Sequence, residues 1–239
     1  MILFDLTFPS PAENLACDEA LLDWCEAGDG GEVLRFWESP EHFVVVGYAN
    51  KVTSEVNVAA CEARDIPILR RCSGGGTVVQ GPGCLNYALV LRITADGPTR
   101  SISAANRFIM QRNCAAVAAV TGQAMEVRGH TDLVTGGFKF SGNSQRRRRK
   151  YLLFHGTFLL NFELKLIGEL LRMPSHQPDY RQSRSHSEFV SNLNVQADDV
   201  KSALQKSWAV AGQCPFVLRS EIAKLVDQKY STPEWNRKF

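Results

Sequence analysis

The 239-residue sequence has no apolar run that approaches the length of a membrane span. Its first residues also lack the basic stretch followed by an apolar one that marks a secretory signal. The seven cysteines are an odd number, are scattered along the chain and include no C-x-x-C pair. This usage argues against a disulfide framework or a zinc site and favours reduced thiols. The absences together predict a soluble, cytoplasmic protein.

Internal repeats, low-complexity linkers and a strong net charge are missing as well. The net charge is +2, and hydrophobic residues at 44% and charged residues at 22% are ordinary for a globular protein with a sizeable core. We therefore expect residues 1–239 to form a single domain, with the last ~45 residues as a helical C-terminal extension.

Both common phosphate-loop patterns, G-x-x-x-x-G-K-[ST] and G-x-G-x-x-G, are absent from the one glycine-rich stretch. Residues 70–87 instead read R-R-C-S-G-G-G-T-V-V-Q-G-P-G-C-L-N-Y. Glycines let a ligand lie against the backbone, and successive N–H groups can bind an anion. The guanidinium groups of Arg70 and Arg71 suit phosphate or carboxylate. The stretch predicts a loop for a small anion or nucleotide, and the structural alternative is a tight turn with solvated arginines.

Hydrophobic spacing gives the remaining elements. The predicted helices cover 14–24, 57–63, 101–120, 163–172, 200–210 and 221–228, and the predicted strands cover 2–8, 33–37, 43–47, 66–69, 88–93, 124–128, 132–135, 138–141 and 151–162. The first strand is expected at a sheet edge, a turn is expected at 28–31 and a polar loop at 174–187. Helices and hairpins in irregular order favour an α+β fold, with mixed and antiparallel sheets flanked by helices, over a doubly wound parallel sheet.

A second unusual stretch surrounds Lys139, which stands between two phenylalanines in a predicted strand. An inward lysine in an apolar setting needs a negative partner, because burying an unpaired ammonium is costly, and a negative substrate would supply one. An outward, solvated lysine is the simpler reading of this residue alone. Further on, His155-Gly156-Thr157 interrupts an apolar strand, where a glycine often marks the close approach of a ligand or another backbone.

Several separated motifs in these stretches share one order and spacing. They are Arg70-Arg71-x-Ser73-Gly74-Gly75-Gly76-Thr77-Val78, Gly83-x-x-Asn86, Asp132-Leu133, Lys139-x-Ser141-Gly142-Asn143-x-Gln145-x-Arg147 and His155-Gly156-Thr157-x-Leu159-Leu160. From about residue 14 to residue 194 the chain resembles the lipoate–protein ligase A family, of the biotin/lipoate protein ligase superfamily. It resembles a short form without the C-terminal accessory domain of the longer ligases.

The resemblance implies a catalytic domain like that of the biotin and lipoate protein ligases. It implies that ATP with Mg²⁺ activates lipoate as lipoyl-adenylate, and that the acyl group then passes to a lysine of a carrier protein such as a lipoyl domain. A separate accessory-domain protein is a further implied partner, whereas a membrane and nucleic acid are not. The substrate- and nucleotide-binding residues that it implies are Arg70, Arg71, Ser73, Gly74, Gly75, Gly76, Thr77, Val78, Asn86, Asp132, Lys139, Ser141, Gly142, His155, Gly156 and Thr157. Lys139 would be catalytic, contacting the acyl carbonyl and the phosphate, and Asp132 would orient the nucleotide and hold the metal.

The sequence departs from the family pattern at Gln80, and it has to be weighed against an alternative enzyme class on the same scaffold. Gln80 stands where many members have histidine, and residues 126–131 lack the nucleophilic cysteine of related octanoyltransferases. The alternative is an octanoyl- or lipoyltransferase on the same scaffold, with an acyl carrier or preformed acyl-adenylate as donor. It would need a thiol of lowered pKa, and Cys72 and Cys84 near the glycine loop are the candidates.

The basic run Arg146 to Lys150 admits three readings. It could pair with the phosphates of a nucleic acid in a protein that is not an enzyme. Because it falls between two predicted strands, a solvated hairpin end is the simpler interpretation. Within the resemblance, it would help to dock an acidic carrier domain.

Overall fold

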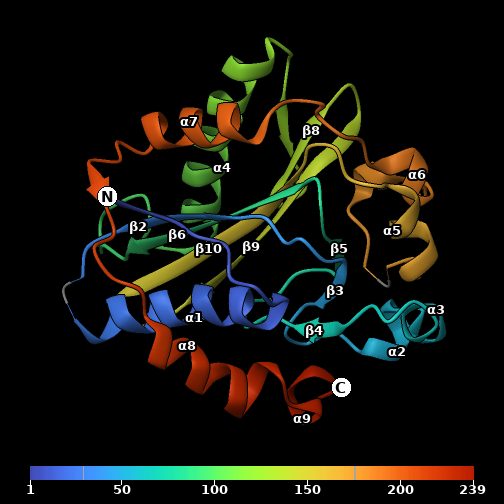
Figure 1. Cartoon of the computed structure of the whole chain (residues 1–239). Helices are drawn as coiled ribbons and strands as arrows, with labels where there is room; N and C mark the ends of the chain where they lie inside the picture. Colours follow the sequence, from blue (N-terminus) through green and yellow to red (C-terminus); the bar gives the residue numbers. More distant parts are fainter. Residues whose placement is uncertain (29, 175) are drawn as a thin grey trace.

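A mixed sheet of eight strands runs through the molecule, with helices on both faces (Figure 1). The computed structural model describes residues 1–28, 30–174 and 176–239. Asp29, in the predicted turn at 28–31, and Ser175, in the predicted loop at 174–187, lie outside the described residues. The strand order of the large sheet is β11-β1-β2-β6-β10-β9-β8-β7, and a small sheet has the order β4-β3-β5. The α+β class expected from the sequence is confirmed.

The strands are β1 (Ile2–Asp5), β2 (Val33–Trp37), β3 (Phe43–Val46), β4 (Ile68–Arg70), β5 (Val78–Gln80), β6 (Cys84–Arg92), β7 (Glu126–Arg128), β8 (Asp132–Thr135), β9 (Phe138–Arg147), β10 (Tyr151–Leu159) and β11 (Gly212–Gln213). The helices are α1 (Pro11–Ala27), α2 (Val52–Glu55), α3 (Val58–Glu62), α4 (Ile102–Thr121), α5 (Lys165–Leu170), α6 (His186–Phe189), α7 (Ala197–Ser207), α8 (Arg219–Leu225) and α9 (Pro233–Asn236), with a 3₁₀ turn at Asp179–Arg181 and a π-helical turn at Val226–Tyr230.

The two central strands, β6 and β10, are apolar on both faces because both faces are covered. Side chains alternate between the faces with a period of two, so Leu89 and Phe154 lie in the cluster with α4, whereas Ala88 and Leu153 lie in the cluster with α1. Figure 1 shows α4 and α7 on one side of the sheet and α1 and α8 on the other. The face toward α1 carries the functional residues.

Helix α1 begins with a capping box and carries polar side chains into the core. Ser10 accepts a hydrogen bond from the backbone N–H of Glu13, whose carboxylate reaches back to Ser10. Further along, Asn14, Asp18 and Glu19 are buried. Buried polar groups need partners, so these three residues fix how α1 sits against its neighbours.

The glycine-rich stretch joins two strands that do not pair with each other. Strands β4 and β5 lie on opposite sides of β3, parallel and antiparallel to it respectively. The chain between Arg70 and Val78 therefore crosses the end of β3, and the small sheet presents the loop to the large one. A parallel pair needs a crossover, which the segment with α2 and α3 supplies.

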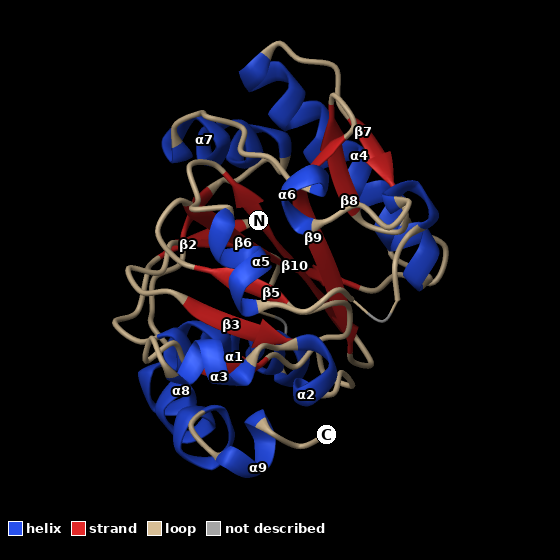
Figure 2. Cartoon of the chain, turned by 90° about the vertical axis from the view of Figure 1, so that its right-hand side faces the viewer, coloured by secondary structure: helices blue, strands red, loops and turns tan. Residues whose placement is uncertain are grey.

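Several elements differ from the sequence-based expectation, and three of the differences concern the large sheet and the C-terminal segment. Strand β1 is not at the edge of the sheet, because β11 pairs with it in parallel. Strand β9 continues to Arg147 instead of ending at Ser141, because its polar residues remain paired with β10. After α7 the chain forms β11, which pairs with β1, and then α8 and α9, which lie below α1 (Figure 1, Figure 2). The division into a domain and an extension stays a prediction. None of the helices in the described ranges is long and apolar enough to cross a membrane.

Replacing Ser10 with alanine should remove the cap of α1 and lower the free energy of unfolding by about 1 kcal/mol. Urea denaturation monitored by circular dichroism measures this change. Ser202→Ala, at an exposed position inside α7, is the matched control and should leave stability within about 0.5 kcal/mol. Equal midpoints for wild type and Ser10→Ala would show that the cap does not hold α1.

Candidate functional site

An open pocket of about 1110 Å³ lies between the glycine loop, the α1 face of the large sheet and the segment after α5. Its volume exceeds that of an ordinary small-ligand pocket. The predicted site residues that line it are Arg71, Gly74, Gly75, Gly76, Thr77, Val78, Asn86, Asp132, Lys139, Ser141, Gly142, His155, Gly156 and Thr157. The fold thus brings together motifs that lie far apart in the sequence.

The hydrogen-bond register of the large sheet produces this convergence. Thr157 on β10 lies opposite Asn86 on β6 and opposite Gly142 on β9, and Gly142 in turn lies opposite Asp132 on β8. Trp37 on β2 extends the same row beyond Asn86. Residues in register across a sheet share a face, so four separate motifs form one continuous strip.

A β-bulge turns Lys139 toward this strip. Leu133 pairs with Ser141 and Val134 pairs with Lys139, which leaves Phe140 as the extra residue of β9. In a regular strand, Lys139 and Gly142 would point to opposite faces because they are three residues apart. With the bulge they share a face, and a Cβ on Gly142 would lie 3.0 Å from the Lys139 Nζ.

Lys139 forms an ion pair with Asp132. Its Nζ lies 2.8 Å from Asp132 Oδ1, and the Tyr180 hydroxyl donates a hydrogen bond of 2.7 Å to Asp132 Oδ2. Burial, followed by the nearby Asp132 charge, raises the pKa of Tyr180, so this phenol stays a proton donor. Tyr180 comes from the segment after α5, which the sequence had predicted only as a polar loop. Both oxygens of the carboxylate are therefore held in place.

The glycine loop is shaped by Arg71. The Arg71 guanidinium is almost fully buried and donates to the carbonyls of Gly74 and Gly76. Burial lowers the pKa of Arg71 to about 10. Gly75 has φ +83°, a conformation that favours glycine, and a Cβ there would lie 3.0 Å from the guanidinium. Gly74 to Gly76 are exposed, and within the described residues their amides donate no hydrogen bond, so they are free to bind an anion.

Arg70 does not line the pocket, contrary to the expectation from the motif. Consecutive residues at the end of a strand point to opposite sides, so only one of the two arginines can face the loop. The Arg70 guanidinium is fully buried among backbone carbonyls of residues 47–50 and of Trp235 and Asn236. The Arg70 guanidinium thus lies behind the glycine loop and outside the pocket.

Ser73 is also shielded from the pocket, at the end of a buried polar chain. His155 Nε2 is hydrogen-bonded to Ser73 Oγ, and His155 Nδ1 lies 2.8 Å from Asp18 Oδ2. Asp18 is in turn ion-paired with Arg35. The order matches a nucleophilic triad, but Ser73 is only 1% exposed and also accepts a hydrogen bond from Arg71 Nε. The chain therefore ties the loop to the sheet.

Sequence reasoning missed Asp18 and Arg35. A signal was present for Arg35, because it is the only charged residue in the otherwise apolar strand Val33–Trp37. A charge inside such a strand predicts a buried partner. Its partner Asp18 lies on the buried face of α1, and nothing local in the sequence distinguishes it from a solvated helix residue.

Gln80 fits into the pocket despite its departure from the family pattern. Its Nε2 donates to Thr157 Oγ1 at 2.9 Å, and Thr157 Oγ1 donates to Asn86 Oδ1 at 2.6 Å. Among the described residues, three buried polar atoms at this place have no partner: Thr77 Oγ1, Gln80 Oε1 and Asn86 Nδ2. Buried polar groups are normally satisfied, so these atoms are suited to a ligand.

Gly156 has a structural explanation. A Cβ there would lie 1.7 Å from Asn143 Oδ1, which accepts a hydrogen bond of 2.6 Å from the Tyr87 hydroxyl. The close approach predicted for this glycine is thus made by a side chain of the neighbouring strand.

The basic run at the end of the β9–β10 hairpin is only partly solvated. Arg146 donates to the carbonyl of Cys72, Arg147 to that of Thr99, and Arg148 pairs with Asp23. Arg149 and Lys150 are exposed. Arg147 is eight residues from Lys139 along β9, or roughly 26 Å at 3.3 Å per residue, so the turn lies far from the pocket lysine.

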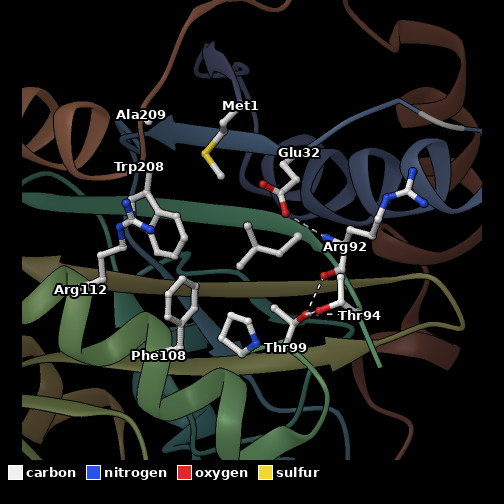
Figure 3. A pocket seen from close by; sticks show the side chains of 11 residues that line it. Met1, Glu32, Arg92, Thr94, Thr99, Phe108, Arg112, Trp208 and Ala209 are labelled. Atoms are coloured by element: carbon white, nitrogen blue, oxygen red, sulfur yellow. Dashed lines mark hydrogen bonds between the residues drawn. The ribbon is translucent and has the colours of Figure 1, made fainter. Parts of the chain in front are cut away.

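A smaller cavity of about 360 Å³ opens on the opposite face of the sheet (Figure 3). Phe108, Arg112 and Trp208 line it together with the start of β1. None of the predicted site residues reaches it. The candidate site is therefore the large pocket on the α1 face.

Comparison with known proteins agrees with this geometry. The model of the lipoyl protein ligase A/B catalytic domain family matches residues 10–209, and the chain belongs to this family of enzymes. Lipoate-protein ligase A subunit 1 of Thermoplasma acidophilum is 27% identical over 93% of this chain and 90% of its own length. Octanoyltransferase LipM of Geobacillus kaustophilus is 25% identical over 98% of this chain and 96% of its own.

Solved structures agree as well. A crystal structure of lipoate-protein ligase A bound with ATP has a TM-score of 0.85 at 25% identity, covering 99% of this chain and 98% of the other. A Thermoplasma acidophilum structure, described as a bi-partite lipoate protein ligase and its E2 lipoyl domain, has a TM-score of 0.83 at 23% identity, covering 99% and 95%, and supports the fold. The relatives thus include both ligases and octanoyltransferases.

The cysteines bear on the choice between these two classes, because the transferase mechanism requires a reactive thiol and the ligase mechanism does not. All seven lie in the described part of the chain, and none lines the pocket. Burial raises the pKa of the Cys72 and Cys84 thiols to about 12. A nucleophilic cysteine needs a lowered pKa, so neither candidate thiol suits the transferase mechanism.

Alkylation of the native protein should therefore be selective. At pH 8 a thiol of pKa about 12 is ionised to roughly one part in ten thousand, so Cys72 and Cys84 should resist iodoacetamide. The partly exposed Cys114 and Cys214 should react first. Peptide mass spectrometry over a time course measures the order, with urea-unfolded protein as the control in which every cysteine reacts. Early labelling of Cys72 would contradict its burial.

Proposed function

We propose that the protein is a lipoate–protein ligase, which activates lipoate with ATP to lipoyl-adenylate and transfers the lipoyl group to a lysine of a carrier protein. The observation that carries the proposal is the bulge in β9, which turns Lys139 into the pocket that Gly74 to Gly76 also line, and within the described residues the amides of these glycines donate no hydrogen bond. A fixed cation opposite an anion-binding loop suits a reaction in which negative charge develops between them.

In the first step an oxygen of the lipoate carboxylate attacks the α-phosphorus of ATP, and the bond to the leaving pyrophosphate breaks. Lys139 stabilises the charge on the α-phosphate, while the glycine amides hold phosphate oxygens. The partnerless atoms of Thr77, Gln80 and Asn86 would complete the contacts to the bound adenylate.

In the second step the amine of the carrier lysine attacks the acyl carbonyl, and AMP leaves while the amine loses a proton to solvent. Lys139 then faces the oxyanion of the tetrahedral intermediate. The mixed anhydride is already activated, so no covalent enzyme intermediate is required. This agrees with a pocket that contains no cysteine.

The carboxylate of Asp132 fits a magnesium ion. Magnesium is commonly held by one or two carboxylates together with substrate phosphates and water, and Asp132 is an oxygen donor in the pocket strip beside Lys139. Residues 1–28, 30–174 and 176–239 contain no group of three or more His, Cys, Asp or Glu that could hold a metal by themselves. When bound with ATP, the ion would neutralise phosphate charge.

The similarity to LipM makes an octanoyltransferase the second candidate. It would need a nucleophile beside Lys139, and Cys72 and Cys84 are buried outside the pocket. Ser73 is shielded and engaged with His155 and Arg71. Use of a preformed acyl-adenylate remains compatible with the same site, because it omits only the first step.

The acceptor that we propose is a lipoyl domain or another lipoate-carrier protein, with a separate accessory-domain protein as a further partner. The two relatives from Thermoplasma acidophilum, one named as a subunit and one as part of a bi-partite ligase, motivate the second partner. The exposed Arg149 and Lys150 lie in the turn beyond β9, and their role in docking an acidic carrier domain stays a prediction.

Lys139→Ala should slow single-turnover formation of lipoyl-adenylate by about a hundredfold or more, the usual effect of removing a preorganised group that stabilises developing charge. Transfer from synthetic lipoyl-adenylate should fall likewise. Lys165→Ala, at an exposed lysine of α5, is the matched control and should be fully active. Each single Cys→Ala variant should retain transfer. A dead cysteine variant, or a thioester-linked acyl group found by intact-mass analysis, would establish the transferase mechanism instead.

Gly142→Ala should reduce adenylate formation about tenfold without unfolding the protein, because the new Cβ would lie 3.0 Å from Lys139 Cε and Nζ and displace the ammonium. Pyrophosphate release measures the rate. The control is Gly168→Ala in α5, where a Cβ meets nothing within 4 Å and the helix should gain up to about 1 kcal/mol. Normal turnover by Gly142→Ala would mean that the position of Lys139 is not critical.

A further inference from the structure

The last helix, α9, lies against β4, the strand that leads into the glycine loop (Figure 1). Strand β4 pairs with β3 on one side only, so Arg70 presents a backbone N–H and C=O at an open edge. The Arg70 N–H donates to Asn236 Oδ1 at 2.9 Å, and the Trp235 indole Nε1 donates to the Arg70 carbonyl at 2.8 Å. Two side chains thus take the place of a neighbouring strand.

The Arg70 side chain continues this connection. Its Nε donates to the Trp235 carbonyl at 3.0 Å and its Nη2 to the Asn236 carbonyl at 3.3 Å. On the other side, its Nη1 donates to the carbonyls of Gly47, Tyr48 and Asn50, at 2.8, 3.1 and 2.8 Å. One buried guanidinium therefore joins α9 to the segment of residues 47–50.

Residues 47–50 in turn contact the glycine loop. The Tyr48 backbone N–H donates to the Ser73 carbonyl at 2.8 Å, and Asn50 Nδ2 donates to the Gly75 carbonyl at 3.1 Å. A Cβ at Gly47 would lie 2.0 Å from the Gly75 carbonyl oxygen, so only glycine permits this approach. Residues 47–50 therefore fix the carbonyls of Ser73 and Gly75, whereas the amides of Gly74 to Gly76 are not used in these contacts.

The C-terminal segment is itself anchored on α1. Lys229 Nζ and the Tyr230 hydroxyl both lie 2.6 Å from Glu19 Oε2, and Asn236 Nδ2 donates to the Tyr230 carbonyl at 2.9 Å. Trp235 and Asn236 lie beyond residues 10–209, the part matched by the family model. The chain of contacts therefore runs from α1, through the C-terminal segment, to the loop.

We propose that Trp235 and Asn236 are positioning residues of the site. Through Arg70 and residues 47–50 they hold the glycine loop in the conformation that receives the phosphate of the acyl-adenylate, although neither touches the ligand. The identity of the ligand as an acyl-adenylate rests on the proposed function. The positioning of the glycine loop by Trp235 and Asn236 does not.

A pair of substitutions at Asn236 tests this control. Both Asn236→Ala and Asn236→Asp lose the side-chain donor to the Tyr230 carbonyl. Only Asn236→Ala also loses the acceptor for the Arg70 N–H, because an aspartate keeps an oxygen there. Hydrogen exchange of the Tyr48 amide, which reports its bond to Ser73, should rise about tenfold in the alanine variant and stay within about twofold in the aspartate variant. The affinity for a non-hydrolysable lipoyl-adenylate analogue, measured by calorimetry, should fall by a similar factor only in the alanine variant.

A matched pair of tryptophans separates positioning from general destabilisation. Trp235→Phe removes the indole donor to Arg70, and Trp208→Phe removes a buried indole donor to Asn113 on the opposite face of the sheet. Only Trp235→Phe should speed Tyr48 exchange and weaken analogue binding. Equal effects of both variants, or wild-type behaviour of Trp235→Phe and Asn236→Ala, would overturn the proposal. If the wild-type protein fails to bind the analogue, the proposed function is wrong, and the exchange of the Tyr48 amide still decides the positioning role.

Discussion

The register of β6, β10 and β9 is the constraint on which the site depends. A shift of one residue would turn His155 and Thr157 toward α4 and bring Phe154 and Phe158 into the pocket. Both faces of β6 and β10 are largely buried, so such a shift would expose the core on one side and bury polar groups on the other. The same apolar pattern that stabilises the sheet therefore also fixes the geometry of the pocket.

Three buried arginines illustrate how charge is organised around this register. Arg35 is neutralised by Asp18, whereas the groups that hold Arg70 and Arg71 are mainly backbone carbonyls. A guanidinium solvated by carbonyls keeps its full positive charge, and the low dielectric around it screens that charge weakly. Two such groups beside the glycine loop favour an anionic ligand there. The carbonyls turn toward the arginines, and the loop amides remain free for the ligand.

The sequence allowed the α+β class and most elements to be predicted, because the hydrophobic periods are strong in α1, α4 and β10. The motifs also identified most of the residues that meet in the pocket. Three features could not be predicted from the sequence, because each depends on pairing between strands or helices that lie far apart in the sequence. The bulge at Phe140 is defined only by the partner strand β8. Which of Arg70 and Arg71 faces the loop depends on how α9 packs on β4, and the Asp18–Arg35 pair depends on how α1 packs on β2.

The pairing of Lys139 with Asp132 gives the pocket a further property. The carboxylate holds the Lys139 ammonium in place by an ion pair, and it competes with a substrate phosphate for that ammonium. Tyr180 restrains that same carboxylate from the segment after α5. An incoming phosphate must therefore draw Lys139 away from Asp132, and a cation that accompanies the phosphate would take the carboxylate that is released. The phosphate thus replaces Asp132 as the partner of Lys139, and the cation replaces Lys139 as the partner of Asp132. The substrate can therefore separate the ion pair without leaving either charge buried and unpaired.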